Sequence, residues 1–369
     1  MAAAWQRDDW IRAAKVSESQ NVFSWFAHCA RICAGTNEWA ADVLTTLAPQ
    51  IDKARTLAKF SAQLSLELLH HFAERSIPMR VFKGQFLAQA AYGDACLRNS
   101  CDIDVIVPRF AVAAAAQCLR LNGFGTAVAE AWFTDAPFLD RFREVPFDGL
   151  GGFFSVDFHW RLANRWTAFP VEAEELFDQG TAVSMNVLGT AVPWFSPSLL
   201  WRIQLTHVVS SDWKGLKTWL DLAHTFDLLD DASTGDVLER CRALQCNFVL
   251  TVAALVLSDV FGRDTSKLIS QQSPATIKRS KLVARLCSDL LLDNDNSAPS
   301  GLNLGRLWSA AAKPPKYRSL LARAMQHDLV DYYDHPPGPS SAVRAFRAVQ
   351  RRIPRVAASN GARRSATGL

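Results

Sequence analysis

The chain has 369 residues, of which 49% are hydrophobic and 21% are charged. This composition is typical of a globular protein with one large domain or two modest ones. A chain of this length buries a core large enough to be stable without disulfide bonds. The net charge of +4 is uneven, because residues 341–369 contain seven arginines and no acid, which leaves about −3 for residues 1–340.

The sequence carries no signal for export or for a membrane span. Residues 1–10 lack a basic region followed by an apolar stretch. The longest near-apolar run, Phe248–Leu257, is well short of the roughly 20 residues that a span requires. The eight cysteines form no CxxC motif, and Cys29 and Cys33 have no second pair that would complete a metal site. We therefore predict a cytoplasmic protein whose cysteines are small buried hydrophobes.

Residues 1–76 are expected to be helical. The segment is rich in alanine, and its apolar residues recur at spacings of three and four, which places them on one helix face. These residues are Leu57, Phe60, Leu64, Leu68 and Phe72. The pattern changes at Ile77-Pro78.

Residues 77–195 mix extended and helical patterns. A hairpin is indicated around Val183–Phe195, with Gly189 near its turn. Pro108 ends a run rich in β-branched residues. The expected segments before the hairpin are a strand at 79–82, a helix at 85–92, a strand at 102–107, a helix at 110–121 and strand-like residues from about 124 to 160.

After Pro197 the pattern is helical up to the proline cluster at 336–339. The helical stretches lie near 198–210, 216–230, 236–260, 275–292 and 316–330. We predict an α+β fold, with a small mixed β-sheet core between helical flanks. Its predicted parts are an N-terminal helical region at 1–76, an α/β core at 77–195, a C-terminal helical domain at 196–335 and a basic, flexible tail at 336–369.

Asp102 and Asp104 are the strongest functional signal. Residues i and i+2 of a strand point to the same face about 6.5 Å apart, so these carboxylates lie side by side while Ile103 and Val105 face the core. Two adjacent carboxylates repel unless a cation lies between them. Mg²⁺ or Mn²⁺ suits this position, since such ions bind carboxylate oxygens together with substrate phosphates.

Asp157 is the candidate for a third metal ligand. It lies in the middle of Phe154–Trp160, a mostly apolar strand in which an unpaired acid is costly. A third carboxylate at the same depth completes a site for two metal ions about 3.5–4 Å apart. An Asp-x-Asp pair alone also occurs on surface strands, so the second acid strengthens the prediction of a metal site.

Lys83, Gly84 and Gln85 form a turn between a strand and a helix. Glycine permits close backbone approach, the free N–H groups at the helix start suit a phosphate, and Lys83 adds a positive charge. A plain strand-to-helix turn explains these residues equally well. Arg98, four residues before Asp102, either reaches a phosphate or braces the carboxylates, and the local sequence favours the brace.

Four motifs occur in order: Val81–Gly84 with Tyr92 and Arg98, then Asp102–Val107, then Val156–Leu162, and then a helical segment containing Ser196–Leu200, His207, Trp213, Leu216, Lys217, Asp221 and Leu222. They resemble a largely uncharacterised nucleotidyltransferase family, the fifth of the DNA polymerase β-type superfamily. That family reads Leu-Lys-Gly, a tyrosine, and Arg-x-x-x-Asp-hydrophobic-Asp-hydrophobic. The similarity covers about residues 60–235.

The resemblance implies a role for each matched residue. Asp102 and Asp104 would bridge two metal ions, Asp157 would complete the ion that activates the attacking group, and the Gly84 turn would hold the triphosphate, with Lys83 and Arg98 balancing its charge. The implied reaction is in-line attack of an acceptor oxygen on the α-phosphorus of an NTP, with release of pyrophosphate. The turn departs from the wider superfamily, which has Gly-Ser or Gly-Gly there and a shorter spacing to the acids, whereas here Gln85 follows Gly84 and Asp102 lies 18 positions on.

Two histidines near these motifs have more than one interpretation. His159 shares the face of Asp157, and we interpret it as a packed histidine rather than a base. His207 is by default a core histidine. The resemblance makes it a possible neighbour of the site, with Asp221 as its partner.

Three functional hypotheses follow. The first is a metal-dependent, ATP- or other NTP-binding nucleotidyltransferase that modifies a hydroxyl or phosphate of a small molecule, peptide or protein. The alternative is a catalytically inactive nucleotide-binding or scaffold protein with the same fold, which the Gln85 departure favours. The third uses the basic tail to bind or modify RNA, and it ranks last because the core has no basic stripe interleaved with aromatics. The acceptor, the NTP and the oligomeric state are not specified by the sequence.

Overall fold

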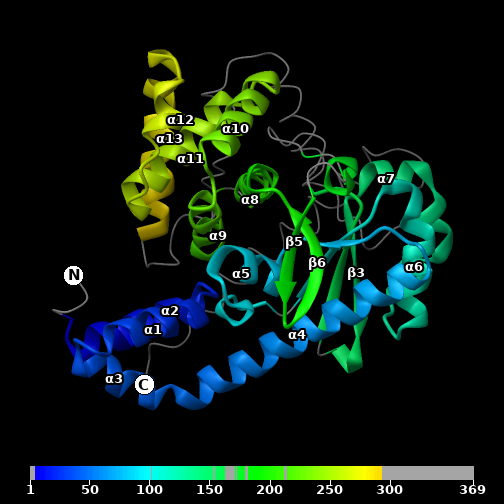
Figure 1. Cartoon of the computed structure of the whole chain (residues 1–369), viewed down its shortest axis with the longest axis horizontal. Coiled ribbons are helices and arrows are strands. Elements are labelled where there is room, and N and C mark those ends of the chain that lie inside the picture. The colour runs from blue at the N-terminus through cyan, green and yellow to red at the C-terminus, as the bar shows by residue number, and fades with distance from the viewer. Residues whose placement is uncertain are drawn as a thin grey trace, which may run out of the picture. The chain divides into compact units, whose positions relative to one another are not determined.

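The computed structural model describes residues 5–100, 102–152, 154–162, 171, 173–178, 182–211, 213 and 215–292. All of them fall in one compact unit, residues 1–300. A four-stranded mixed sheet and a two-stranded hairpin lie among helices (Figure 1), which confirms the predicted α+β class. The helix expected at 316–330 and the basic tail lie outside the described residues, and the division into four parts stays a prediction.

Four helices precede the sheet: α1 (Arg7–Ser19), α2 (Phe23–Cys33), α3 (Glu38–Thr46) and α4 (Ala48–Glu74). The first three pack together around Trp10 and Phe26. The fourth is much longer and runs from this bundle along the sheet (Figure 1), where it contacts the first two strands and the helices beside them. The predicted helical character of this region is confirmed.

The face that α4 buries differs from the predicted one. Leu68 and Phe72 are buried, but Leu57 and Phe60 are 45% and 43% exposed. The buried residues in the middle of the helix are small, namely Ala58, Ser61, Ala62 and Ser65. Small side chains let two helices approach closely, so the face that meets α5 (Gly84–Tyr92) is made of them and the larger residues lie on its flanks.

The sheet has the strand order β1-β2-β4-β3. The strands are β1 (Arg80–Val81), β2 (Asp102–Ile106), β3 (Glu144–Gly149) and β4 (Phe154–His159). The two central strands, β2 and β4, are parallel, and β1 and β3 are antiparallel edge strands. Ile103 and Val105 of β2 are buried in the core, as the alternating pattern predicted.

The connections of the sheet are mostly helical. They are α5 (Gly84–Tyr92), η2 (Ala95–Leu97), η3 (Arg109–Ala111), α6 (Val112–Leu121), η4 (Glu130–Thr134), α7 (Ala136–Arg141) and η5 (Leu150–Gly152). The prediction of continuous strand-like structure from about 124 to 160 was therefore wrong for the part that η4 and α7 occupy. Asp135 explains α7, because its carboxylate accepts a hydrogen bond from the Phe138 backbone N–H and caps the helix, and a proline lies in the first turn.

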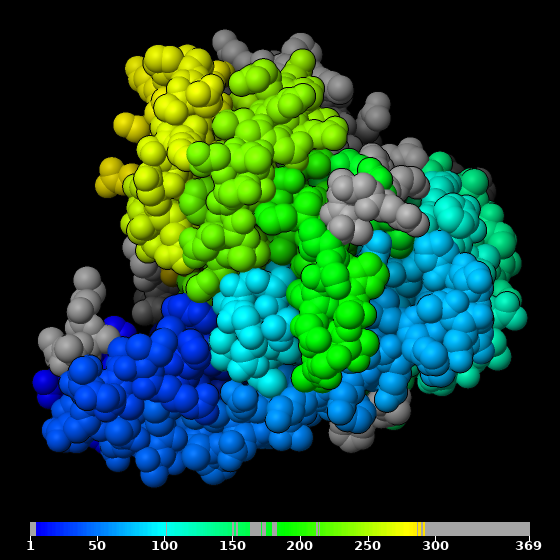
Figure 2. All heavy atoms as spheres, in the orientation of Figure 1, coloured from blue at the N-terminus to red at the C-terminus, as the bar shows by residue number. Residues whose placement is uncertain are grey.

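The predicted hairpin is formed by β5 (Ala182–Val187) and β6 (Thr190–Phe195), and Gly189 in its turn has a φ of 87°. Figure 2 shows it on the surface beside α5, which it contacts. The remaining elements are η6 (Ala173–Phe177), α8 (Pro197–Ser210), α9 (Leu216–Phe226), α10 (Asp231–Ala243), α11 (Asn247–Phe261), α12 (Ser266–Ser270) and α13 (Pro274–Leu292). The helix predicted at 236–260 is interrupted after α10, where Gln245 adopts a left-handed φ of 57°.

Two chemical features of the described chain bear on the predictions. No helix in the described ranges is long and apolar enough to cross a membrane. The cysteines among these residues form no disulfide, and all except Cys29 and Cys33 are buried. Burial, with a smaller contribution from Cys33, raises the pKa of the Cys29 thiol to about 11, which keeps that thiol protonated.

Candidate functional site

Three carboxylates meet on one face of the sheet. Asp102 and Asp104 come from β2, and Asp157 comes from the parallel neighbour β4, where it pairs directly opposite Asp104. Paired residues of adjacent strands point to the same face, so the three side chains converge. All of them line a polar cavity of about 420 Å³. This cavity is the candidate active site.

Asp104 is the most enclosed of the three and is 4% exposed. Its Oδ1 lies 3.0 Å from Lys83 Nζ and 3.4 Å from His159 Nε2. Burial alone would raise the pKa of Asp104, but the charge on Lys83 and the contact with His159 outweigh it and hold the pKa well below its usual range. Asp104 is therefore ionised and is an available oxygen ligand for a cation.

Asp157 has the opposite electrostatic character. Burial, followed by the negative charges of Asp104, Asp102 and Glu144, raises the pKa of Asp157 to about 6, although His159 opposes this. An acid whose ionisation is opposed by other acids is a position where a bound cation relieves repulsion. The donor chemistry of the site thus fits a divalent metal ion.

His159 lies beside the carboxylates, on the face that it shares with Asp157, although our interpretation from the sequence was a packed histidine. Asp104, Asp157 and His159 each offer a ligand atom within 4.8 Å of the others. On its other side the ring meets Glu144 of β3, which lies opposite it in the sheet. Glu144 has no local sequence signal, because the pairing of β3 with β4 decides its position.

Arg98 is buried beside the cavity and braces a helix. Its Nε donates to Asp221 Oδ2 of α9 at 3.0 Å, and the Tyr92 hydroxyl donates to the other oxygen of that carboxylate at 2.7 Å. Asp221 thus pairs with Arg98 and Tyr92, where the sequence had suggested His207. Arg98 also lines the cavity, so it adds positive charge there.

Gly84 begins α5 with a φ of 62°, a left-handed conformation that favours glycine. A Cβ at this position would lie 3.9 Å from both Asp102 O and Ser100 Oγ, which is ordinary contact. The conformation, rather than crowding within the protein, therefore explains the glycine. Ser100 also donates to Asp102 Oδ1 at 2.6 Å, so this turn and the start of β2 lie together.

The predicted phosphate-binding residues do not all turn their side chains toward the cavity. Lys83 and Arg98 line the carboxylate cavity. The side chain of Gln85 is 2% exposed, and its Oε1 accepts a hydrogen bond from Ser61 Oγ of α4 at 2.9 Å. The side chain therefore faces α4. At the start of α5, Gln85 presents only its backbone.

Further residues of the cavity lining come from Ser19–Asn21, at the end of α1 and the start of the loop after it, and from the start of α9. Lys217 of α9 donates to Asn99 O at 2.8 Å. Burial, assisted by the nearby charge of Arg98, lowers the pKa of Lys217 to about 8. His207 of α8 also lines the cavity, and burial together with the charge on Lys83 holds its pKa well below its usual range, so the ring is neutral.

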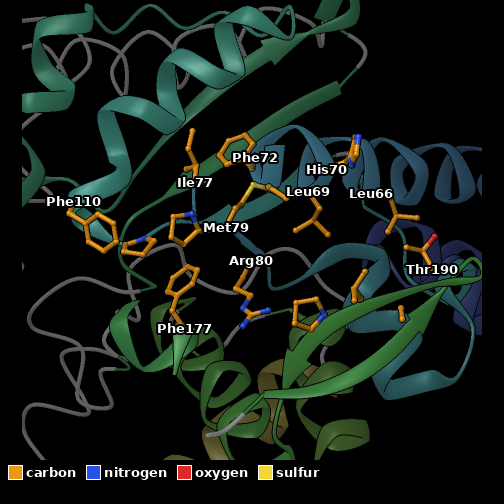
Figure 3. Close-up of a pocket in the computed structure, with 16 residues that line it drawn as sticks. Leu66, Leu69, His70, Phe72, Ile77, Met79, Arg80, Phe110, Phe177 and Thr190 are labelled. Atoms are coloured by element: carbon orange, nitrogen blue, oxygen red, sulfur yellow. The ribbon is translucent and has the colours of Figure 1, made fainter. Parts of the chain in front are cut away.

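A larger cavity of about 670 Å³ lies outside this site, and Figure 3 shows it. Its lining is mostly apolar and comes largely from α4, the segment that leads into β1, and β6. Arg80 and His70 are the titratable groups among the described residues that line it, and the Arg80 guanidinium lies 5.9 Å from the centroid of the Phe177 ring. The described part of its lining contains no carboxylate or thiol, so it offers no chemistry comparable to that of the smaller cavity.

A family model described as an uncharacterised nucleotidyltransferase matches residues 6–262. None of the curated proteins and none of the solved structures matches the chain. The matched segment contains the sheet, the carboxylate cavity and the helices that enclose it, which supports nucleotidyl transfer as the general activity. The chain therefore belongs to this family of nucleotidyltransferases.

Proposed function

We propose that the chain transfers a nucleoside monophosphate from an NTP to a hydroxyl or phosphate group on a small molecule, peptide or protein. The acceptor oxygen forms a bond to the α-phosphorus, the bond from that phosphorus to the bridging oxygen breaks, and pyrophosphate leaves. A hydroxyl acceptor loses its proton to solvent. The observation that carries this proposal is the convergence of Asp102, Asp104 and Asp157 on one cavity.

The proposed site uses divalent metal ions, Mg²⁺ or Mn²⁺, with Asp102, Asp104 and Asp157 as ligands. The fit is supported by the raised pKa of Asp157, because its neighbouring acids leave an unbalanced negative charge. Metal ions bound there would position the triphosphate and stabilise the charge that develops on it. Asp104, held ionised beside Lys83, is the carboxylate best prepared to bind.

We assign the triphosphate to the Lys83 end of the cavity, next to the Gly84 turn where α5 begins. The first N–H groups of α5 are free of helix partners and carry partial positive charge, which suits a phosphate. Lys83, Arg98 and Lys217 bring three cationic side chains to the same cavity and balance the negative charge of the triphosphate. Gln85 contributes through its backbone N–H, since its side chain is bonded to α4.

Binding of NTPs is the first test. A thermal-shift screen of the four NTPs with Mg²⁺ or Mn²⁺ should show metal-dependent stabilisation, because a bound ligand raises the free energy of unfolding. Asp104→Asn should remove the shift. Asp148→Asn is the matched control, since Asp148 is an exposed carboxylate on β3 that does not line the cavity. No shift in the wild type, or an equal shift in Asp104→Asn, would contradict the proposal.

Turnover is the second test. Release of pyrophosphate should depend on an acceptor and should be lost in Asp157→Asn. A panel of hydroxyl- and phosphate-bearing metabolites, peptides and proteins gives the acceptor class. Release that is unchanged in Asp157→Asn would remove this residue from the site.

A second candidate function is a nucleotide-binding protein without turnover. Two observations favour it: Gln85 is turned away from the cavity, and Lys83 is paired with Asp104. Such a protein would show the thermal shift with NTP and metal but release no pyrophosphate with any acceptor. Asp157-dependent release of pyrophosphate would exclude it.

A further inference from the structure

His159 is a buried side chain whose two ring nitrogens each meet a carboxylate without forming a well-aligned hydrogen bond. It is 2% exposed, and neither Nδ1 nor Nε2 has a hydrogen-bond partner of suitable geometry among the described residues. Nδ1 lies 2.9 Å from Glu144 Oε2, and Nε2 lies 3.4 Å from Asp104 Oδ1. These contacts are close enough for an ion pair. Buried polar atoms without hydrogen bonds are uncommon in native proteins and indicate a missing partner or a functional role.

The position of Nε2 suits a ligand of the same metal ion that Asp104 and Asp157 bind. In an octahedral site with ligand distances of about 2.1 Å, adjacent ligand atoms lie about 3 Å apart and opposite ones about 4.2 Å apart. The 3.4 Å from Nε2 to Asp104 Oδ1 is close to the adjacent value. The ligand atoms of all three residues lie within 4.8 Å of one another, so small adjustments bring them around one ion.

We infer that His159 Nε2 is a direct metal ligand and that Glu144 orients the ring. The inference rests on the proposed metal-dependent function and extends it, because it adds a nitrogen ligand to the carboxylates. Nδ1–H would donate to Glu144 Oε2, and Arg143 holds the other oxygen of Glu144 at 2.8 Å. A carboxylate behind a ligating imidazole fixes the ring and increases its basicity.

A nitrogen ligand changes which ion the site prefers. Mg²⁺ binds oxygen ligands almost exclusively, whereas Mn²⁺ accepts both carboxylate and imidazole. Two carboxylates and one imidazole therefore favour Mn²⁺ over Mg²⁺. The competing role for His159 is a buried cation between Asp104 and Glu144, in which Nε2 keeps its proton and binds no metal.

Pulsed electron paramagnetic resonance of Mn²⁺ bound to the nucleotide-free protein distinguishes these roles. A directly bound imidazole gives a nitrogen coupling, and its pattern changes when the protein contains ¹⁵N-labelled histidine. We expect this coupling in the wild type and its loss in His159→Asn. His207→Asn is the matched control, because His207 lines the same cavity, and this variant should keep the coupling.

Calorimetric titration gives a second readout. His159→Asn should weaken Mn²⁺ binding by about tenfold or more and Mg²⁺ binding by about threefold or less. Glu144→Gln should weaken Mn²⁺ binding about tenfold and keep the nitrogen coupling, since it perturbs the ring from behind. If His159→Asn does not fold, the labelled wild type, His207→Asn and Glu144→Gln still distinguish direct metal binding by His159 from the competing role.

Three results would overturn the inference: bound Mn²⁺ without nitrogen coupling in the wild type, coupling that survives His159→Asn, or no Mn²⁺ binding at millimolar concentration. Pyrophosphate release tests the proposed function independently. Release without nitrogen coupling would support nucleotidyl transfer and contradict His159 as a metal ligand. Nitrogen coupling without release for any acceptor would support His159 as a metal ligand and contradict nucleotidyl transfer.

Discussion

Replacing Asp157 with asparagine should stabilise the metal-free protein while it removes activity. Asparagine has nearly the same size and carries no charge. Burial and the neighbouring acids raise the pKa of Asp157 to about 6, so its ionised form opposes folding when no cation is bound. A residue kept despite such a cost is expected at a functional site.

The size of the effect follows from the two pKa values of this carboxyl. An unfolded chain gives Asp a pKa of ~3.9, and the folded protein gives Asp157 a pKa of about 6. Stability is lost as the pH rises between these values, because the folded state then holds a proton that the unfolded state has released. The full difference corresponds to about 3 kcal/mol. Asp157 is only partly buried, so solvent screening reduces the expected gain to about 1–2 kcal/mol.

Urea unfolding in the presence of EDTA measures this gain. Asp157→Asn should be more stable than the wild type at about pH 7.5 and equal to it at about pH 3, below both pKa values, where both proteins are neutral at this position. Asp148→Asn, an exposed carboxylate on the neighbouring strand, is the control and should change neither value. Equal or lower stability of Asp157→Asn at the higher pH would refute the reasoning.

Three further substitutions test the surroundings of the site. Asp221→Asn leaves the buried Arg98 charge without its partner and should lower the free energy of unfolding by about 3–5 kcal/mol, so an unchanged urea midpoint would contradict the assigned ion pair. Gly84→Ala forces alanine into the left-handed region and should cost about 1–2 kcal/mol in the same assay. It should also weaken NTP binding in calorimetry, and an unchanged affinity argues against a phosphate at this turn. Lys83→Met removes the ammonium group that lies beside Asp104. Mn²⁺ should then bind the nucleotide-free protein more tightly, whereas an NTP should bind more weakly. If the affinities for Mn²⁺ and for the NTP change in the same direction, Lys83 does not compete with the metal.

The sequence by itself determined the features whose signals are local. Alternation along a strand places Asp102 and Asp104 on one face whatever strand lies beside them. The apolar run around Asp157 identified a second buried strand with an acid in it. Local signals can also conflict, since the cap at Asp135 begins α7 within a region whose residue pattern is extended.

The tertiary structure decided which groups meet. Asp104 lies opposite Asp157 because β2 and β4 pair in parallel in one register, and a shift of one residue would turn Asp157 to the other face. Arg98 finds Asp221 across 123 positions of the chain, and the pairing of β3 with β4 brings Glu144 to His159. Partners inside a protein are set by distance and by burial, which strengthens charge interactions by excluding water. Neither quantity is present in the spacing of residues along the chain. The acidic pair could therefore be predicted from the sequence, whereas the pairing of Arg98 with Asp221 and of His159 with Glu144 could not.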